Sequence, residues 1–220
     1  MKIIELFSEI DTATAKAICS NLDRYKNTPV TIRINSPGGS VTAGLGIADA
    51  IQRHGKVTAE IVGLAASMAS ILAVAASHCR MSTTALLMVH NPWVQSTGDS
   101  RTLRKEAETL DKFAGSLVTF YASKTGKSRE EIQSMMDTET WLDADQAKAA
   151  RFVDAIFKGA DTRAALRWGN KFPTIQARLR KPQKANPSQI AKEYLSLPQG
   201  PARSAFFTKH KTTLFSTRTR

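Results

Sequence analysis

A strand-like run passes directly into a helix of small residues near the middle of this 220-residue chain. Val57–Val62 is rich in β-branched residues, and Gly63-Leu64-Ala65-Ala66 leads from it into Ser67 and an alanine-rich stretch. The neighbours of Ser67 are too small to cover its hydroxyl group. The segment therefore predicts a strand-to-helix junction that exposes a serine.

The same alternation of strands and helices continues through residues 1–157. Strands are expected at Ile3–Phe7, Pro29–Asn35, Val57–Val62 and Ala85–Val89, and Asp137–Leu142 is also expected to be extended. Helices are expected after Asp11, at Val41–His54 before Gly55, from Ser67, at about Arg101–Ser123, and after Ser128 and Asp143, which have capping-box spacing to Glu131 and Gln146. This alternation indicates an α/β fold with a largely parallel sheet.

Two interpretations of Ser67 are open on its own segment. Serine is a favoured N-cap residue, so its hydroxyl can satisfy the first turn of the helix that follows. Alternatively, Ser67 is a nucleophile. The unpaired N–H groups and the positive dipole end of a helix N-terminus would then meet negative charge developing on a substrate oxygen.

Two other segments carry residue types that fit such chemistry. In Arg33–Ser40 a strand leads into a Pro-Gly-Gly turn, where glycines let the backbone approach a ligand closely. His90 follows the strand-like run Ala85–Val89 just where Pro92 stops it. Together the motifs SPGG, AASMAS and VHNP resemble those of ClpP, the proteolytic subunit of the Clp protease. They resemble still more closely the ClpP-like head-maturation proteases of tailed phages, over roughly residues 1–157.

The resemblance implies a ClpP/crotonase-like fold of repeated β-β-α units with a long interlocking helix, and a serine endopeptidase that works through an acyl-enzyme. Ser67 would be the nucleophile. A serine needs a base within hydrogen-bond reach, and the ordinary pKa of a histidine suits His90 to that role. A carboxylate should complete a Ser-His-acid triad by fixing the imidazole tautomer.

Two carboxylates compete for the third position. A gapless alignment puts Glu139, two residues before Trp141, where the family commonly has its catalytic aspartate. Asp137 lies two residues earlier and would point to the same face of a strand, so it remains the alternative acid. By resemblance, the oxyanion hole consists of the amides of Gly39 and Met68. Standing alone, SPGG is equally consistent with an ordinary turn.

The remaining candidates fit structural roles better. Ser70 could share a helix face with Ser67, but the family match places the nucleophile between Ala66 and Met68. His54 is expected to cap a helix end, and His78 is expected at the end of the Ser67 helix, pointing away from the site.

No catalytic metal and no cofactor are expected. The chain has four histidines, including His210 near its end, and no H-x-x-x-H or C-x-x-C spacing. The two cysteines, Cys19 and Cys79, are too few for a disulfide framework and are interpreted as buried thiols of a reducing compartment.

The helix at about Arg101–Ser123 carries a wide apolar stripe, which can pack on its own domain or against a partner subunit. The ClpP family uses the corresponding helix to interlock two rings, so the resemblance favours a homo-oligomer of heptameric or stacked rings. The family's N-terminal segment, which lines the axial entrance, has no counterpart before the first strand. Coupling to an ATP-driven unfoldase is therefore not expected.

Charge divides the chain into two parts. Residues 1–157 carry 17 Lys and Arg against 17 Asp and Glu, whereas residues 158–220 carry 14 against 2. The C-terminal part is predicted to be a basic, largely disordered tail, either a solvated extension or a contact for an acidic protein or DNA. With no signal peptide and no membrane span, the protein is expected in the host cytoplasm or inside a phage prohead.

The sequence thus predicts a protease that processes phage scaffold or capsid precursors during head maturation. Two alternatives belong to other classes. One is an acyl-CoA enzyme of the crotonase type, in which paired amides hold a thioester oxygen. The other is a non-catalytic assembly protein on a protease scaffold.

Overall fold

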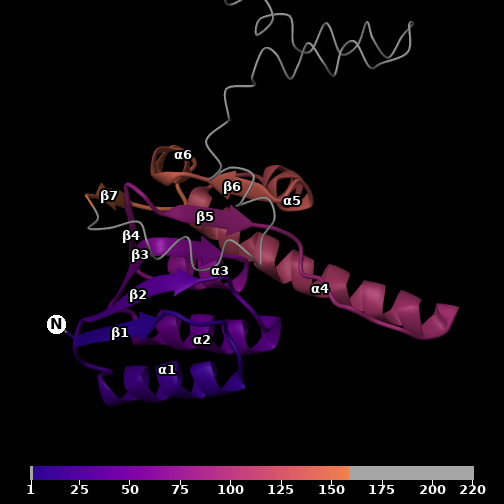
Figure 1. The fold of residues 1–220 in the computed structure, drawn as a ribbon, viewed down its shortest axis with the longest axis horizontal. Helices are drawn as coiled ribbons and strands as arrows, with labels where there is room; N and C mark the ends of the chain where they lie inside the picture. Colours follow the sequence, from indigo (N-terminus) through magenta and orange to yellow (C-terminus); the bar gives the residue numbers. More distant parts are fainter. Residues whose placement is uncertain (1, 159–220) are drawn as a thin grey trace, which may run out of the picture. The chain divides into compact units, whose positions relative to one another are not determined.

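A seven-stranded sheet forms the centre of residues 2–158, the part of the chain that this computed structural model describes (Figure 1). Five strands follow in the order β1-β2-β3-β4-β7, all in parallel pairs. Strand β5 pairs in parallel with β3, and β6 pairs antiparallel with β5. The elements are β1 Lys2–Leu6, α1 Thr12–Arg24, β2 Val30–Ser36, α2 Val41–His54, β3 Val57–Ala66, α3 Met68–Ala75, β4 His78–Ser82, β5 Leu86–Val89, α4 Ser100–Thr125, α5 Arg129–Asp137, β6 Thr140–Leu142, α6 Ala144–Ala149 and β7 Ala155–Phe157. The predicted α/β fold with a largely parallel sheet is confirmed.

Local sequence signals account for most helix ends. The Asp11 side chain accepts the Thr14 amide at 2.7 Å, which begins α1. Gly55 ends α2 in the left-handed conformation, with φ at 70°. Ser128 and Asp143 each form a complete capping box at the start of α5 and α6. These boundaries follow from the sequence because each depends on a few neighbouring residues.

The core lies between the sheet and helices α1, α2 and α3. One set of alternating residues on the strands is almost fully buried, as shown by Ile32, Ile34 and Ile61. All eight residues of α3 are buried, and this helix contacts β3, α2 and α4. The N-terminus of α3 follows directly on the carboxyl end of β3, so Ser67 lies at the carboxyl end of an inner strand of the sheet.

Helix α4 belongs to the body of the domain only in its C-terminal half. Figure 1 shows its N-terminal half extending beyond the sheet. The buried residues are Leu117, Val118, Tyr121 and Thr125, while the side chain of Leu103 in the first turn is 43% exposed. Packing on its own domain thus explains the second half of the stripe and leaves the first half to solvent in the single chain.

Three local predictions are wrong. Asp137–Leu142 is not extended throughout, because α5 continues to Asp137 and Glu139 turns the chain with φ at 47° before β6 begins at Thr140. Strand β3 continues past Val62 to Ala66, pairing with both β2 and β5. His78 does not end the Ser67 helix. It begins β4, a strand in which the buried Cys79 and Met81 alternate with the more exposed His78 and Arg80.

The other sequence predictions concern the cysteines, the C-terminal tail, metal sites and membrane helices. Neither cysteine forms a disulfide, and only Cys79 is fully buried. The basic tail and His210 lie outside the described residues. Within residues 2–158, no group of three or more His, Cys, Asp and Glu side chains is placed to hold a metal ion. None of the described helices combines the length and apolar character that crossing a membrane requires.

Candidate active site

The ends of three paired strands converge at one place in the sheet. Ala66, the last residue of β3, is in register with Met88 of β5. Val89, the last residue of β5, is in register with Thr140, the first residue of β6. One step beyond these pairs lie Ser67, His90 and Glu139, so the sheet brings together three groups that are far apart in the chain.

Ser67 occupies a strained backbone position and directs its hydroxyl group at a histidine. Its φ is 54° and its ψ is −128°, a conformation that non-glycine residues rarely adopt. The Ser67 Oγ lies 2.8 Å from His90 Nε2. Although Ser67 precedes α3, its side chain makes no capping hydrogen bond. The interpretation of this hydroxyl as a helix cap is therefore wrong.

The environment of His90 favours the neutral form of its imidazole. Burial lowers the pKa of His90 below its ordinary value, and the negative charge of Glu139 acts in the opposite direction. An unprotonated Nε2 can accept the proton of the Ser67 hydroxyl. The position and the protonation state both suit a general base.

The two candidate acids lie in different surroundings. Glu139 acts on His90 through its charge, and the indole Nε1–H of Trp141 donates to its carboxylate at 3.0 Å. The Asp137 carboxylate accepts hydrogen bonds from Asn91 and Gln133 instead, each at 2.7 Å, and these bonds lower its pKa. Among the described residues, Glu139 is the carboxylate whose charge reaches His90. The electrostatic effect on His90 thus belongs to Glu139, whereas the Asp137 carboxylate is engaged by Asn91 and Gln133.

The SPGG turn lies directly against the Ser67 junction. A Cβ added to Gly38 would come within 2.7 Å of Ser67 Cβ and 2.9 Å of Met68 N, and the φ of Gly38 is 90°. Only glycine fits there. Gly38 N–H donates to Ser36 Oγ at 3.2 Å, which fixes the turn from within.

The two predicted oxyanion donors are neighbours of this contact. Gly39 follows Gly38 with φ at 148°, and the flanking Gly38 O and Ser40 N–H both bond to Ile10, which anchors the turn. Within residues 2–158, the amides of Gly39 and Met68 donate no backbone hydrogen bond. Met68 is also the first residue of α3, where the helix dipole adds positive potential.

Sequence reasoning missed Gly38, Trp141 and Tyr121. Of the SPGG glycines, it singled out only the second. Trp141 lies two residues after Glu139, and their hydrogen bond depends on the left-handed turn at Glu139, which the sequence pattern does not predict. Tyr121 belongs to the apolar stripe of the helix predicted at about Arg101–Ser123, and periodicity says nothing about the partner of its hydroxyl.

The other candidates lie elsewhere. Ser70 is fully buried and bonds to backbone and to Tyr121. His54 ends α2, and its Nε2 lies 3.0 Å from the Tyr25 carbonyl. His78 lies 3.6 Å from Asp154, at the opposite end of the Ser67 helix from the site.

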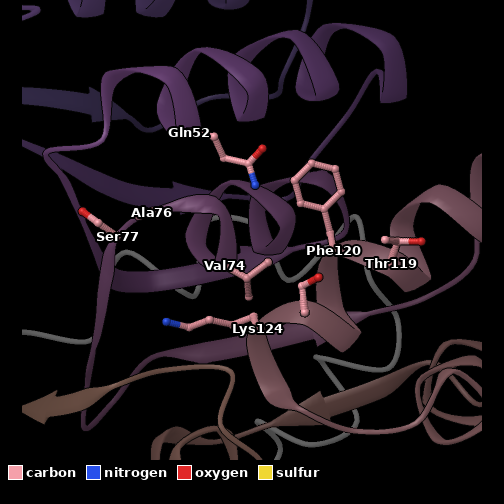
Figure 2. Close-up of a pocket in the computed structure, with 8 residues that line it drawn as sticks. Gln52, Val74, Ala76, Ser77, Thr119, Phe120 and Lys124 are labelled. Atoms are coloured by element: carbon pink, nitrogen blue, oxygen red, sulfur yellow. The ribbon is translucent and has the colours of Figure 1, made fainter.

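A cavity of about 490 Å³ lies between α2, α3 and α4. Figure 2 shows Gln52 of α2, Val74 of α3, and Phe120 and Lys124 of α4 around it. None of the three converging residues lines this cavity, so it is separate from the candidate active site.

Comparisons with known proteins show what the chain is similar to. The family model described as Clp protease matches residues 1–160. The ATP-dependent Clp protease proteolytic subunit 1 of Chlamydia abortus is 38% identical over 133 residues, which cover 58% of this chain and 69% of that protein. The ATP-dependent Clp protease proteolytic subunit of Bacteroides fragilis strain NCTC 9343 is 34% identical over 164 residues, 70% of this chain and 78% of that protein. The ATP-dependent Clp protease proteolytic subunit 1 of Streptomyces avermitilis is 32% identical over 167 residues, which cover 73% of this chain and 77% of that protein.

Proposed function

The chain belongs to the Clp protease family, and on this premise we propose that it is a serine endopeptidase whose acyl-enzyme forms on Ser67. One observation carries the assignment of the nucleophile. The Ser67 hydroxyl is held 2.8 Å from the partly buried imidazole of His90. The backbone of Ser67 is strained, and its side chain makes no capping hydrogen bond to the helix that follows. Strain of this kind persists where the surrounding structure imposes it and is frequent at active sites.

Proton transfer along this contact would drive the first step. As Ser67 Oγ attacks the scissile carbonyl carbon, its proton passes to His90 Nε2. The imidazolium then returns that proton to the leaving amine, which departs as the acyl-enzyme forms. Water attacks the ester in the second half-reaction, with His90 again acting as base and then as acid.

Glu139 would complete the triad by orienting His90. Its charge favours the imidazolium that forms during attack, and the Trp141 indole holds the carboxylate in place. The amides of Gly39 and Met68 would stabilise the oxyanion, since neither is used in the backbone hydrogen bonding of residues 2–158. Hydrolysis by these groups needs no ATP, so short unfolded peptides are the substrates that test the chemistry most directly.

A fluorophosphonate probe tests the proposed nucleophile. The wild type is expected to gain one adduct, and mass spectrometry of its peptides should place that adduct on Ser67. Ser67→Ala should gain none, while Ser77→Ala, which removes a hydroxyl at the far end of α3, should react as the wild type does. Folded wild-type protein that stays unlabelled and binds acyl-CoA would contradict the proposal in favour of a crotonase-type enzyme.

Removing the charge of Glu139 is expected to lower kcat by about a hundredfold. Glu139→Gln keeps an oxygen for the Trp141 indole but removes the charge that raises the pKa of His90 against the effect of burial. That pKa then falls further. In the wild type, kcat/KM should rise with pH through a pKa below the ordinary histidine value of about 6.5. In Glu139→Gln this acidic limb should move to still lower pH.

The matched control for this variant is Asp137→Asn. It should leave both kcat and the acidic limb near their wild-type values, because Asp137 bonds to Asn91 and Gln133. Glu139→Asp keeps the charge and should retain more activity than the glutamine variant. If Asp137→Asn caused the larger loss and moved the limb, the role of the acid would pass to Asp137.

We extend the proposal to assembly and substrate on the resemblance of the sequence. The exposed first half of α4, including Leu103, supports a homo-oligomer in which this helix contacts a second copy. The proposed substrates are phage scaffold or capsid precursors. Co-expression of the wild type and of Ser67→Ala with such proteins, followed by intact-mass measurement, tests this assignment. Precursors that remain whole beside an enzyme that cleaves short peptides would refute the substrate and leave the chemistry standing.

A further inference from the structure

The hydroxyl group of Ser70 joins the three elements that surround the Ser67 junction. Its Oγ lies 2.6 Å from the carbonyl oxygen of Ser67, 3.0 Å from that of Met88 and 2.7 Å from the hydroxyl of Tyr121. Met88 is in β5, two residues before His90, and Tyr121 is in α4. Both Ser70 and Tyr121 are almost completely buried.

The direction of each hydrogen bond in this cluster is fixed by chemistry. Carbonyl oxygens can only accept, so the single proton of the Ser70 hydroxyl is shared between the oxygens of Ser67 and Met88. The Ser70 oxygen must therefore accept from Tyr121, whose hydroxyl is the donor. Burial raises the pKa of Tyr121 well above its ordinary value, which keeps that proton in place. The bonds run in one direction from α4 to the carbonyl of Ser67.

The carbonyl of Ser67 also fixes the amide of the next residue. It accepts the Ser70 N–H at 2.9 Å as well as the Ser70 hydroxyl at 2.6 Å, so both of its lone pairs are occupied. In a planar trans peptide, the C=O and the N–H that follows point in opposite directions. The hydrogen bonds that fix the carbonyl oxygen of Ser67 therefore also fix the direction of the Met68 N–H.

We propose that Ser70 and Tyr121 are positioning residues for the oxyanion hole, setting the Ser67–Met68 peptide plane so that the Met68 amide faces the substrate oxygen. This inference rests on the proposed function, because it assigns the Met68 amide a role in stabilising the oxyanion. The buried face of α4, which carries Tyr121, would thus help to orient the site. Neither residue touches the reacting atoms.

Two single variants and their combination test the proposal. Ser70→Ala removes one of the two donors to the Ser67 carbonyl and should lower kcat about tenfold, less than the loss of an oxyanion donor itself. Tyr121→Phe keeps the ring that packs on Phe152 and should lower kcat about threefold, through weakened polarisation of the Ser70 hydroxyl. KM should change less than twofold, whereas the Ki of a peptide boronate, which needs the oxyanion hole, should rise with the loss in kcat.

The double variant separates positioning from stability. Ser70→Ala alone leaves a buried tyrosine hydroxyl without its partner, which should lower the urea midpoint. Adding Tyr121→Phe removes that unpaired group, so the midpoint should recover toward the wild-type value while kcat stays about tenfold low. If kcat recovered together with the midpoint, the pair would be purely structural and the proposal would be overturned.

Phe120→Leu is the control on the same turn of α4, since Phe120 lines the cavity of Figure 2 and has no polar group. It should leave kcat and Ki unchanged. Amide exchange at Ser70, whose N–H donates to the Ser67 oxygen, provides a readout that needs no catalysis and should rise in Tyr121→Phe but not in Phe120→Leu. Unchanged Ser70 exchange would refute the positioning role. Failure of wild-type labelling at Ser67 would instead refute the proposed function.

Discussion

Alanine in place of Ser67 is expected to lower kcat/KM for a short peptide by about 10⁴-fold or more. The variant loses the proposed nucleophile, and no second hydroxyl can replace it, because Ser70 is buried and bonded to two carbonyl oxygens. Residual hydrolysis would come from direct attack of water on the carbonyl carbon, with the proposed oxyanion donors stabilising the negative charge that forms on its oxygen. Steady-state cleavage of a fluorogenic peptide without ATP measures the effect.

The dependence of Ser67 on His90 can be measured in the same assay. His90→Ala should cost nearly as much as Ser67→Ala, and the double variant should be no worse than either, because the two groups act as one unit across their 2.8 Å contact. His78→Ala removes an exposed imidazole from β4 and should be close to wild type. Additive losses in the double variant would mean that the two residues act independently, against the proposed proton transfer.

Alanine in place of Gly38 is expected to lower kcat by about 10³-fold, although Gly38 donates no group to the reaction. The added Cβ would lie 2.6 Å from the Ala66 carbonyl oxygen, 2.7 Å from Ser67 Cβ and 2.9 Å from Met68 N. Two of these are backbone atoms and the third is the Cβ of Ser67, so the strain cannot be relieved by rotating a side chain. Ser67 and the Met68 amide, the proposed nucleophile and oxyanion donor, must therefore move together. Kinetics on protein shown to be folded by circular dichroism measure the loss.

Gly46→Ala is the matched control for this substitution. A Cβ at Gly46 would meet nothing within 4 Å, and the residue lies inside α2 with an ordinary φ. Alanine there should leave kcat unchanged and raise stability by up to about 1 kcal/mol, since glycine is the poorer helix former. Wild-type turnover in Gly38→Ala would show that the SPGG turn can move away from Ser67 without consequence.

The helices and the parallel character of the sheet could be predicted because their signals are local. Asp11, Gly55, Ser128 and Asp143 each mark a helix boundary through contacts within a few residues, and the structure agrees at all four. Strand β4 escaped prediction because only Cys79 and Met81 of its five residues are buried and apolar, too few for a clear alternation.

The choice between Glu139 and Asp137 could not be made from the sequence for a physical reason. It depends on where α5 ends and on which residue of β6 pairs with β5, and both are set by tertiary contacts. Glu139 adopts a left-handed conformation, which the residue type glutamate does not predict. The Ser70–Tyr121 contact likewise joins residues 51 positions apart, and no local pattern encodes it.

The convergence of strand ends has a consequence for how the chain tolerates changes in length. Glu139 is placed by the turn between α5 and the three-residue strand β6, and a slip of one residue there would carry its carboxylate about 3.3 Å along the strand and turn it to the other face. The connection from Asn91 to Asp99 enters a helix whose first half lies clear of the sheet, so extra residues there leave the register of β5 and β6 untouched. Insertions between Asn91 and Asp99 are therefore expected to be tolerated. Insertions between α5 and β6 are expected to displace Glu139 from its position near His90.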